Sequence, residues 1–129
     1  LMTTQATTES VQRLMEIGYL AAGTGMTKEA LTIFEGIEAV RPESELPLVG
    51  RSFAQLSAGY PQEAVKSIME KALAQNPNSA IAAAFAGLCL KQAGLNAEAE
   101  AVLKGVVDEG ADPAAVSMAE ALLSEPVAA

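Results

Sequence analysis

The fold is decided by the stretch Gly25-Met26-Thr27-Lys28-Glu29-Ala30, because its pattern Gly-x-x-x-Glu-Ala returns twice along the chain. The later copies are Gly59-Tyr60-Pro61-Gln62-Glu63-Ala64 and Gly94-Leu95-Asn96-Ala97-Glu98-Ala99. The final alanines of successive copies are 34 and 35 residues apart, and a proline follows each copy, at Pro42, Pro77 and Pro113. A period near 34 residues with a small residue inside the unit and a proline at its end is typical of stacked helix-turn-helix units.

Each part of the pattern has a physical role. The glycine ends the first helix of a pair in the left-handed conformation, and the alanine lies where two helices cross closely. The proline ends the second helix, because it has no backbone N–H to donate. Hydrophobic periodicity predicts helices over residues 9–22, 28–40, 45–58, 61–75, 79–93, 97–109 and 113–124. Their starts are expected to be capped by Thr27, Ser44, Asn78, Asn96 and Asp112.

These helices predict an all-α fold, a right-handed superhelix of three helix-turn-helix repeats plus a C-terminal capping helix. The last predicted helix has no partner, so we expect it to cover the apolar end of the final pair. Residues 9–125 are expected to form one domain, and residues 126–129 a C-terminal tail. Residues 1–8 are expected to be a disordered N-terminal segment, in which Leu1 before Met2 resembles a cloning remnant.

Composition excludes several classes of function. The chain has 8 basic and 16 acidic residues and a formal net charge of −8, and its basic residues are scattered singly. Binding to nucleic acid or to an anionic membrane surface needs clustered basic residues. The longest weakly polar stretch, residues 80–90, is about half the length that spans a bilayer. The N-terminus has no signal-peptide pattern and the single cysteine has no disulfide partner, so we expect a cytosolic protein.

Residues that carry enzyme chemistry are scarce. The chain has no histidine, and Cys89 lies between two leucines without an imidazole to activate it. The acidic clusters, such as Glu43 with Glu45 and Glu98 with Glu100, are expected to be solvated surface groups. The sequence therefore predicts no enzyme activity, no metal site and no cofactor.

The repeat resembles the tetratricopeptide repeat (TPR). The residues that match its small and apolar positions in the first unit are Leu14, Ile17, Gly18, Gly25, Ala30, Phe34 and Pro42. In the third unit they are Ala86, Gly87, Leu90, Gly94, Ala99, Leu103 and Pro113. The second unit departs from the pattern, because Arg51, Ser52 and Gln55 stand at positions that are normally apolar or small. A first helix rotated or shifted by about one residue in this unit would account for the departure.

A narrower resemblance is to the small TPR chaperones of bacterial type III secretion systems, the needle-subunit chaperones and their Hrp-type relatives. It rests on Ile17-Gly18-Tyr19-Leu20, Val40-Arg41-Pro42, Gly87-Leu88-Cys89-Leu90 and Gly110-Ala111-Asp112-Pro113. This resemblance implies a cytoplasmic bacterial chaperone that binds a helical needle subunit and prevents its premature assembly. It also implies a second small co-chaperone as a partner.

In TPR proteins, five positions on the first helix of each pair project into a concave groove. In this chain those positions hold Gln12, Met15, Tyr19, Ala22 and Gly23, then Leu46, Val49, Phe53, Leu56 and Ser57, then Ile81, Ala84, Leu88, Lys91 and Gln92. The expected partner-binding residues are Met15, Tyr19, Val49, Phe53, Leu56, Ile81 and Leu88. Members that grip a C-terminal carboxylate need Lys and Asn where this chain has Met15 and Tyr19, so that activity is disfavoured.

An apolar groove is expected to receive an amphipathic helix from a partner. Two alternatives remain open from the sequence. The chain is either a chaperone that sequesters a secretion substrate, or a structural adaptor or self-associating scaffold whose groove is filled by another copy. Each aromatic side chain could also pack between neighbouring helices and face no partner.

Overall fold

Residues 7–126, the part of the chain that the computed structural model describes, form helices joined by short turns and contain no β-strand. The helices are α1 (Thr8–Gly23), α2 (Thr27–Val40), α3 (Leu46–Ser57), α4 (Pro61–Lys66), the π-helical segment η1 (Ser67–Ala72), α5 (Leu73–Gln75), α6 (Ala80–Gln92), α7 (Asn96–Glu109) and α8 (Pro113–Ser124). The elements α4, η1 and α5 follow one another without a break and form one rod. The predicted all-α fold is confirmed, and each predicted helix boundary lies within one residue of the observed one.

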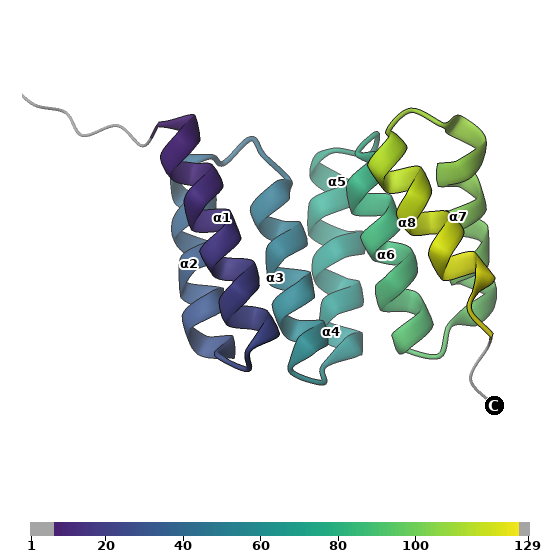
Figure 1. The fold of residues 1–129 in the computed structure, drawn as a ribbon, viewed down its shortest axis with the longest axis horizontal. Helices are drawn as coiled ribbons and strands as arrows, with labels where there is room; N and C mark the ends of the chain where they lie inside the picture. The colour runs from purple at the N-terminus through teal and green to yellow at the C-terminus, as the bar shows by residue number, and fades with distance from the viewer. Residues whose placement is uncertain (1–6, 127–129) are drawn as a thin grey trace, which may run out of the picture.

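The helices stand in a row of antiparallel pairs, with α1 and α8 at opposite ends (Figure 1). We call α1, α3, α6 and α8 the inner helices, because each of them packs on the next along the array. The outer helices are α2, the rod from α4 to α5, and α7, and each of them pairs with the inner helix that precedes it. Helix α8 packs on both α6 and α7, as predicted for a capping helix.

The repeat residues have the predicted roles. The turn glycines Gly25, Gly59 and Gly94 have φ angles of 86°, 90° and 81°, in the left-handed region that favours glycine. The alanines that close the three patterns are buried at the helix crossings. The spacing of glycine and alanine in the sequence therefore fixes where each pair turns and where its helices meet.

Phe34 on α2 connects the first two pairs. Its ring is fully buried and lies against Gly18 of α1 and Gly50 of α3. A Cβ atom at Gly18 would lie 2.7 Å from the Cζ atom of Phe34, and one at Gly50 would clash with Cε1. The absence of a side chain at both positions thus lets α1 and α3 approach the same aromatic ring. Gly87 and Leu103 make the equivalent contact between α6 and α7.

The predicted shift of the second unit is not observed. Ser52 precedes its turn glycine by seven residues, as Gly18 and Gly87 do, and it is equally buried. Its hydroxyl donates a hydrogen bond of 2.7 Å to the carbonyl oxygen of Val49. Helix α3 tolerates its other polar residues because Arg51 forms an ion pair with Glu38, with Nη1 and Oε2 3.2 Å apart, and Gln55 accepts a hydrogen bond from Ser67.

Several predicted helix caps are wrong. Asp112 caps α8 as predicted, but α6 is capped by Ser79 and not by Asn78, since the Ser79 hydroxyl accepts from the amide of Ala82. Thr27 and Asn96 are the first residues inside their helices, and Ser44 precedes the cap position of α3. Thr8, expected to lie in the N-terminal segment, is the first residue of α1. The rest of that predicted segment, apart from residue 7, and residues 127–129 of the predicted tail lie outside the described residues.

Candidate functional site

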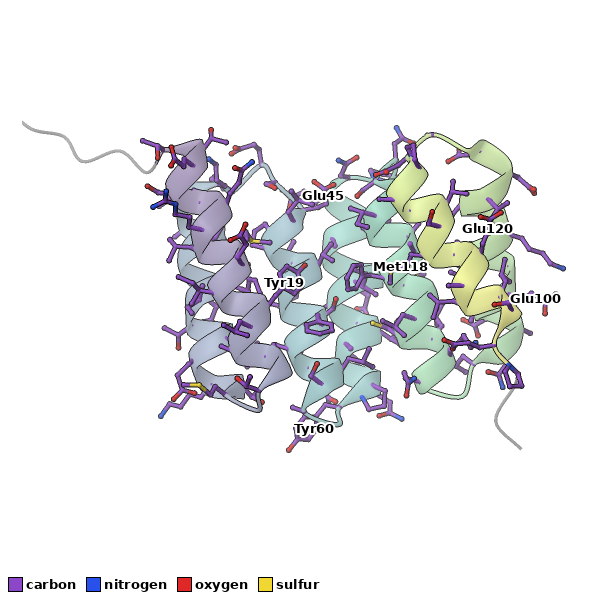
Figure 2. The ribbon with its side chains drawn as sticks, in the orientation of Figure 1. Tyr19, Glu45, Tyr60, Glu100, Met118 and Glu120 are labelled. Carbon is purple, nitrogen blue, oxygen red and sulfur yellow. The ribbon has the colours of Figure 1, made fainter. Side chains whose placement is uncertain are left out.

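A continuous track of apolar side chains crosses the inner helices. The ring centroids of Tyr19 on α1 and Phe53 on α3 are 5.4 Å apart, and those of Phe53 and Phe85 on α6 are 6.3 Å apart. Beyond Phe85, Leu88 of α6 packs against the same buried cluster as Met118 of α8. Figure 2 labels Tyr19 and Met118 near the two ends of this track.

We define the inner track as the half-buried apolar residues that the inner helices contribute to this face. Its members are Met15, Tyr19, Phe53, Leu56, Ile81, Phe85, Leu88 and Met118. Their buried parts pack against the core clusters, and their remaining surface is open to solvent. These side chains therefore both bridge neighbouring helices and present apolar surface to a partner.

Tyr19 is held between two aromatic rings. Its ring meets Phe34 edge to face at a centroid distance of 5.3 Å and lies tilted against Phe53. Burial raises the pKa of the Tyr19 hydroxyl to about 12. The hydroxyl thus stays protonated at neutral pH, as a neutral hydrogen-bonding group within an otherwise apolar track.

Six of the seven predicted partner-binding residues lie on the inner track, and the seventh, Val49, does not. Val49 is only 1% exposed, because it packs in the core beside Ile68 and Ala72 of the outer rod. Its predicted role in partner binding is therefore wrong for this structure. The groove positions expected at Ala22 and Ala84 are also buried.

Two residues of the inner track were missed by the sequence analysis. Phe85 follows the expected groove position Ala84 by one residue. Ala84 packs in the core shared with α8, whereas Phe85 lies against Phe53. Met118 lies on α8, which was predicted only to cover the last pair. An aromatic residue among five alanines in α6 was the one signal that could have indicated Phe85.

The inner track carries no charge, and the surplus of acidic residues lies elsewhere. The inner helices have three acidic and three basic residues, whereas the outer helices have nine acidic and four basic residues. The basic residues of α3 and α6 are engaged within the fold, since Arg51 pairs with Glu38 of α2 and Lys91 binds the end of α8. A partner that covers the track therefore meets apolar surface without burying an unpaired charge.

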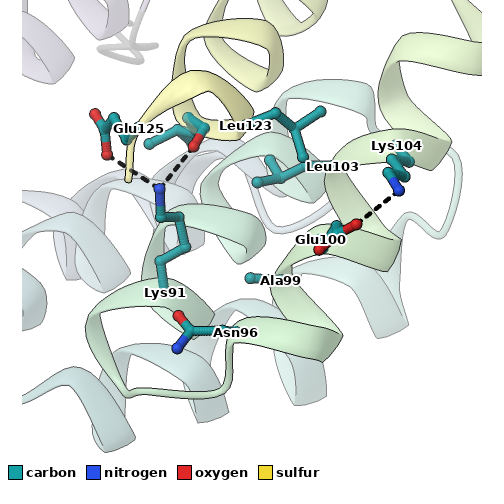
Figure 3. Close-up of a pocket in the computed structure, with 9 residues that line it drawn as sticks. Lys91, Asn96, Ala99, Glu100, Leu103, Lys104, Leu123 and Glu125 are labelled. Carbon is teal, nitrogen blue, oxygen red and sulfur yellow. Dashed lines mark hydrogen bonds and ion pairs between the residues drawn. The ribbon is translucent and has the colours of Figure 1, made fainter. Parts of the chain in front are cut away.

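A cavity of about 280 Å³ lies between α7 and the C-terminal end of α8 (Figure 3). The Lys91 ammonium on its wall donates a hydrogen bond of 2.6 Å to the carbonyl oxygen of Leu122, and its Nζ lies 3.2 Å from Oε1 of Glu125. Lys104 and Glu100, also on the wall, form a second ion pair, with Nζ and Oε1 2.6 Å apart. The contacts of Lys91 join α6 to the C-terminal end of α8, whereas the Glu100–Lys104 pair lies within α7.

Reactive groups are few in the described residues. Burial raises the pKa of the Cys89 thiol to about 11, so the thiol is protonated and a poor nucleophile at neutral pH. Within residues 7–126 no group of three or more His, Cys, Asp or Glu side chains could hold a metal ion. Over the same residues, no helix is both long and apolar enough to cross a bilayer.

Paired helices with an uncharged apolar inner face define a helical-repeat protein that binds other proteins. The sequence model of the tetratricopeptide repeat family matches residues 55–123, which is more than half of the chain. The chain therefore belongs to the tetratricopeptide repeat family. A comparison with curated proteins finds no match. Members of this family are generally non-enzymatic scaffolds, and membership makes this chain a protein–protein interaction adaptor.

Proposed function

We propose that this protein is a type III secretion chaperone that binds an apolar helix of a secretion substrate along the inner track. The observation that carries the proposal is the aromatic series Tyr19, Phe53 and Phe85, which is half-exposed across three helices. Exposed aromatic side chains that are held rigidly by their neighbours supply large contact area at little cost in conformational entropy. They are the kind of anchor that carries most of the binding energy in an interface.

The occupant that fits this track best is an amphipathic helix. Its apolar stripe would lie on the inner track, and its polar side would remain in solvent. An extended peptide is disfavoured, because the described residues contain no strand edge to which its backbone could hydrogen-bond. Helical structure in the partner satisfies its backbone groups internally before it binds.

We assign the helix to a needle subunit, on the strength of the resemblance to the small TPR chaperones of type III secretion. A subunit built to polymerise exposes apolar surface as a monomer, and covering that surface would keep it soluble until export. The proposed setting is the bacterial cytoplasm, with a second small co-chaperone as an additional partner. The same inner track would serve a structural adaptor with no chaperone role, which is the second candidate.

Coexpression with the needle subunit from the source organism tests the proposal. We expect the needle subunit, which polymerises alone, to elute with this chain as a soluble 1:1 complex in size-exclusion chromatography. Phe85→Ala should release the subunit into the polymer fraction, whereas Tyr60→Ala, which truncates an exposed aromatic outside the inner track, should retain the complex. A needle subunit that polymerises equally in the presence of the parent chain would contradict the chaperone role and favour the adaptor.

A further inference from the structure

Helix α1 exposes a second apolar surface, on the side that faces away from the rest of the array. Leu14, Ile17 and Leu20 are 40%, 51% and 68% exposed, which is high for large aliphatic side chains on a helix of the array. We call these three residues the α1 edge. They are separate from the inner track, whose members Met15 and Tyr19 point from the same helix toward the core.

The repeat shows that the α1 edge occupies an interface position. Ile17 and Leu20 precede the turn glycine Gly25 by eight and five residues. The same distances before Gly59 and Gly94 give Arg51 and Ala54 in α3, and Ala86 and Cys89 in α6. Ala54, Ala86 and Cys89 are all 0% exposed.

The neighbour that covers these positions is the outer helix of the preceding pair. Ala54 packs in one cluster with Phe34 and Ile37 of α2, and Arg51 pairs with Glu38 of the same helix. Ala86 and Cys89 pack in one cluster with residues of the rod from α4 to α5. On α1 the same positions have no covering helix among residues 7–126.

The sizes of the side chains specify what can cover the α1 edge. Three of the four covered positions in α3 and α6 hold alanine or cysteine, and the fourth holds Arg51, which pairs with Glu38 of the covering helix. The covering helix of α3 supplies large residues such as Phe34. On α1 the positions hold isoleucine and leucine, so a covering helix must supply small residues if the two helices are to approach closely.

This chain carries such a helix surface at its other end. The side of α8 that faces away from α6 and α7 presents small exposed residues at helical spacing. They are Ala114, Ser117, Ala121 and Ser124.

The charges beside the two surfaces are complementary. Arg13 lies one turn before Ile17 on the α1 edge, and Glu120 lies beside Ala121 on the exposed side of α8. Arg13 is paired with Glu9 of its own helix, but both side chains are more than 70% exposed, so this pair is weak and easily exchanged. Within residues 7–126 Glu120 has no ion-pair partner.

We propose that a second copy of the chain docks the exposed side of its α8 on the α1 edge, with Arg13 facing Glu120 of the other copy. Because α1 and α8 lie at opposite ends of the array, each copy keeps one free α1 edge and one free α8 (Figure 1). A contact between two different surfaces of this kind continues head to tail and does not stop at a dimer. The inner track remains uncovered, so the self-association does not depend on the proposed chaperone function.

Sedimentation equilibrium of the full chain over a wide concentration range tests the contact. We expect the weight-average mass to rise with concentration without a plateau at the dimer. Leu20→Asp should lower the association constant at least tenfold. Tyr60→Asp should leave it unchanged, because Tyr60 is about as exposed as Leu20 but lies away from α1 and α8, at the bottom of the molecule in Figure 2. A chain that is monomeric at every concentration would overturn the proposal, as would association that Leu20→Asp leaves unchanged.

A charge exchange tests the pairing of Arg13 with Glu120. Arg13→Glu and Glu120→Arg should each weaken association several-fold, and the double variant should restore it. Circular dichroism checks that all variants remain helical, as expected for exposed positions. A plateau at the dimer, or a double variant as weak as the single ones, would show that the copies meet through other surfaces and would overturn the proposed contact.

Discussion

Single residues decide how closely the helices of this array approach. Phe34 shows this most clearly, because one ring fills the space that two glycines leave on neighbouring helices. The glycines of the sequence thus divide into two kinds. Gly25 and Gly59 are needed for their backbone conformation, whereas Gly18 and Gly50 are needed for their lack of a side chain.

Substitution of Gly50 by alanine should destabilise the fold. The added methyl group would overlap the buried ring of Phe34, and overpacking of this kind costs about 1–3 kcal/mol of unfolding free energy. Gly36→Ala is the matched control, because it lies within α2 with open space around its Cβ position. The control should raise stability by roughly 0.5–1 kcal/mol through helix propensity, as measured by urea denaturation. A Gly50→Ala variant as stable as the parent would contradict the close packing of α3 on Phe34.

Cys89 should act as a buried apolar residue. Cys89→Ala removes one buried sulfur atom and should lower the unfolding free energy by about 1 kcal/mol while partner binding is retained. The raised thiol pKa further predicts that iodoacetamide at pH 8 alkylates the native chain far more slowly than the urea-unfolded chain. Fast alkylation of the native protein, or lost binding at unchanged stability, would show that the thiol has a functional role.

At the scale of the helices, the sequence predicts positions better than details. Glycine, alanine and proline at a period near 34 residues located every helix, since each of these residues has a strong local conformational effect. The π-helical segment Ser67–Ala72 was not predicted, because apolar periodicity reports which side of a helix is buried and not which carbonyl each amide reaches. The predicted caps of α2 and α7 are each one residue too late. Thr27 and Asn96 follow their turn glycines so closely that the helix has already begun.

The stability of helix α8 should depend on Lys91. Its ammonium donates to the carbonyl oxygen of Leu122 and pairs with Glu125, at the negative end of the α8 dipole. Lys91→Met should lower the unfolding free energy by about 1–2 kcal/mol and speed hydrogen exchange in α8. Lys104→Met breaks an exposed pair within α7 and should have little effect. Equal exchange rates in the two variants would show that packing alone holds α8.

At the scale of the whole molecule, the sequence predicted part of the inner track, the candidate partner-binding surface. The spacing of Met15 and Tyr19 in α1, and of Phe53 and Leu56 in α3, placed them on the inner helices, where the structure has them. The sequence could not show that Val49 is buried while Phe53 and Leu56 remain partly exposed. Whether a residue on a half-buried stripe points inward or outward depends on the rotation of its helix. In α6, likewise, Ala84 is buried while its neighbour Phe85 lies on the inner track. Helix rotation follows from packing against both neighbours, which the sequence of one helix does not contain.

The proposed function requires that the inner track receives an apolar helix from a partner. This requirement can be measured by isothermal titration of folded Phe53→Ala against the partner that co-purifies with the parent chain. We predict that binding weakens by roughly 2 kcal/mol or more, because Phe53 is the middle ring of the aromatic series. Glu98→Gln, on outer helix α7, should bind like the parent, with circular dichroism confirming the fold of both variants. A folded Phe53→Ala variant that binds with the parent affinity would contradict the claim and place the partner on another surface.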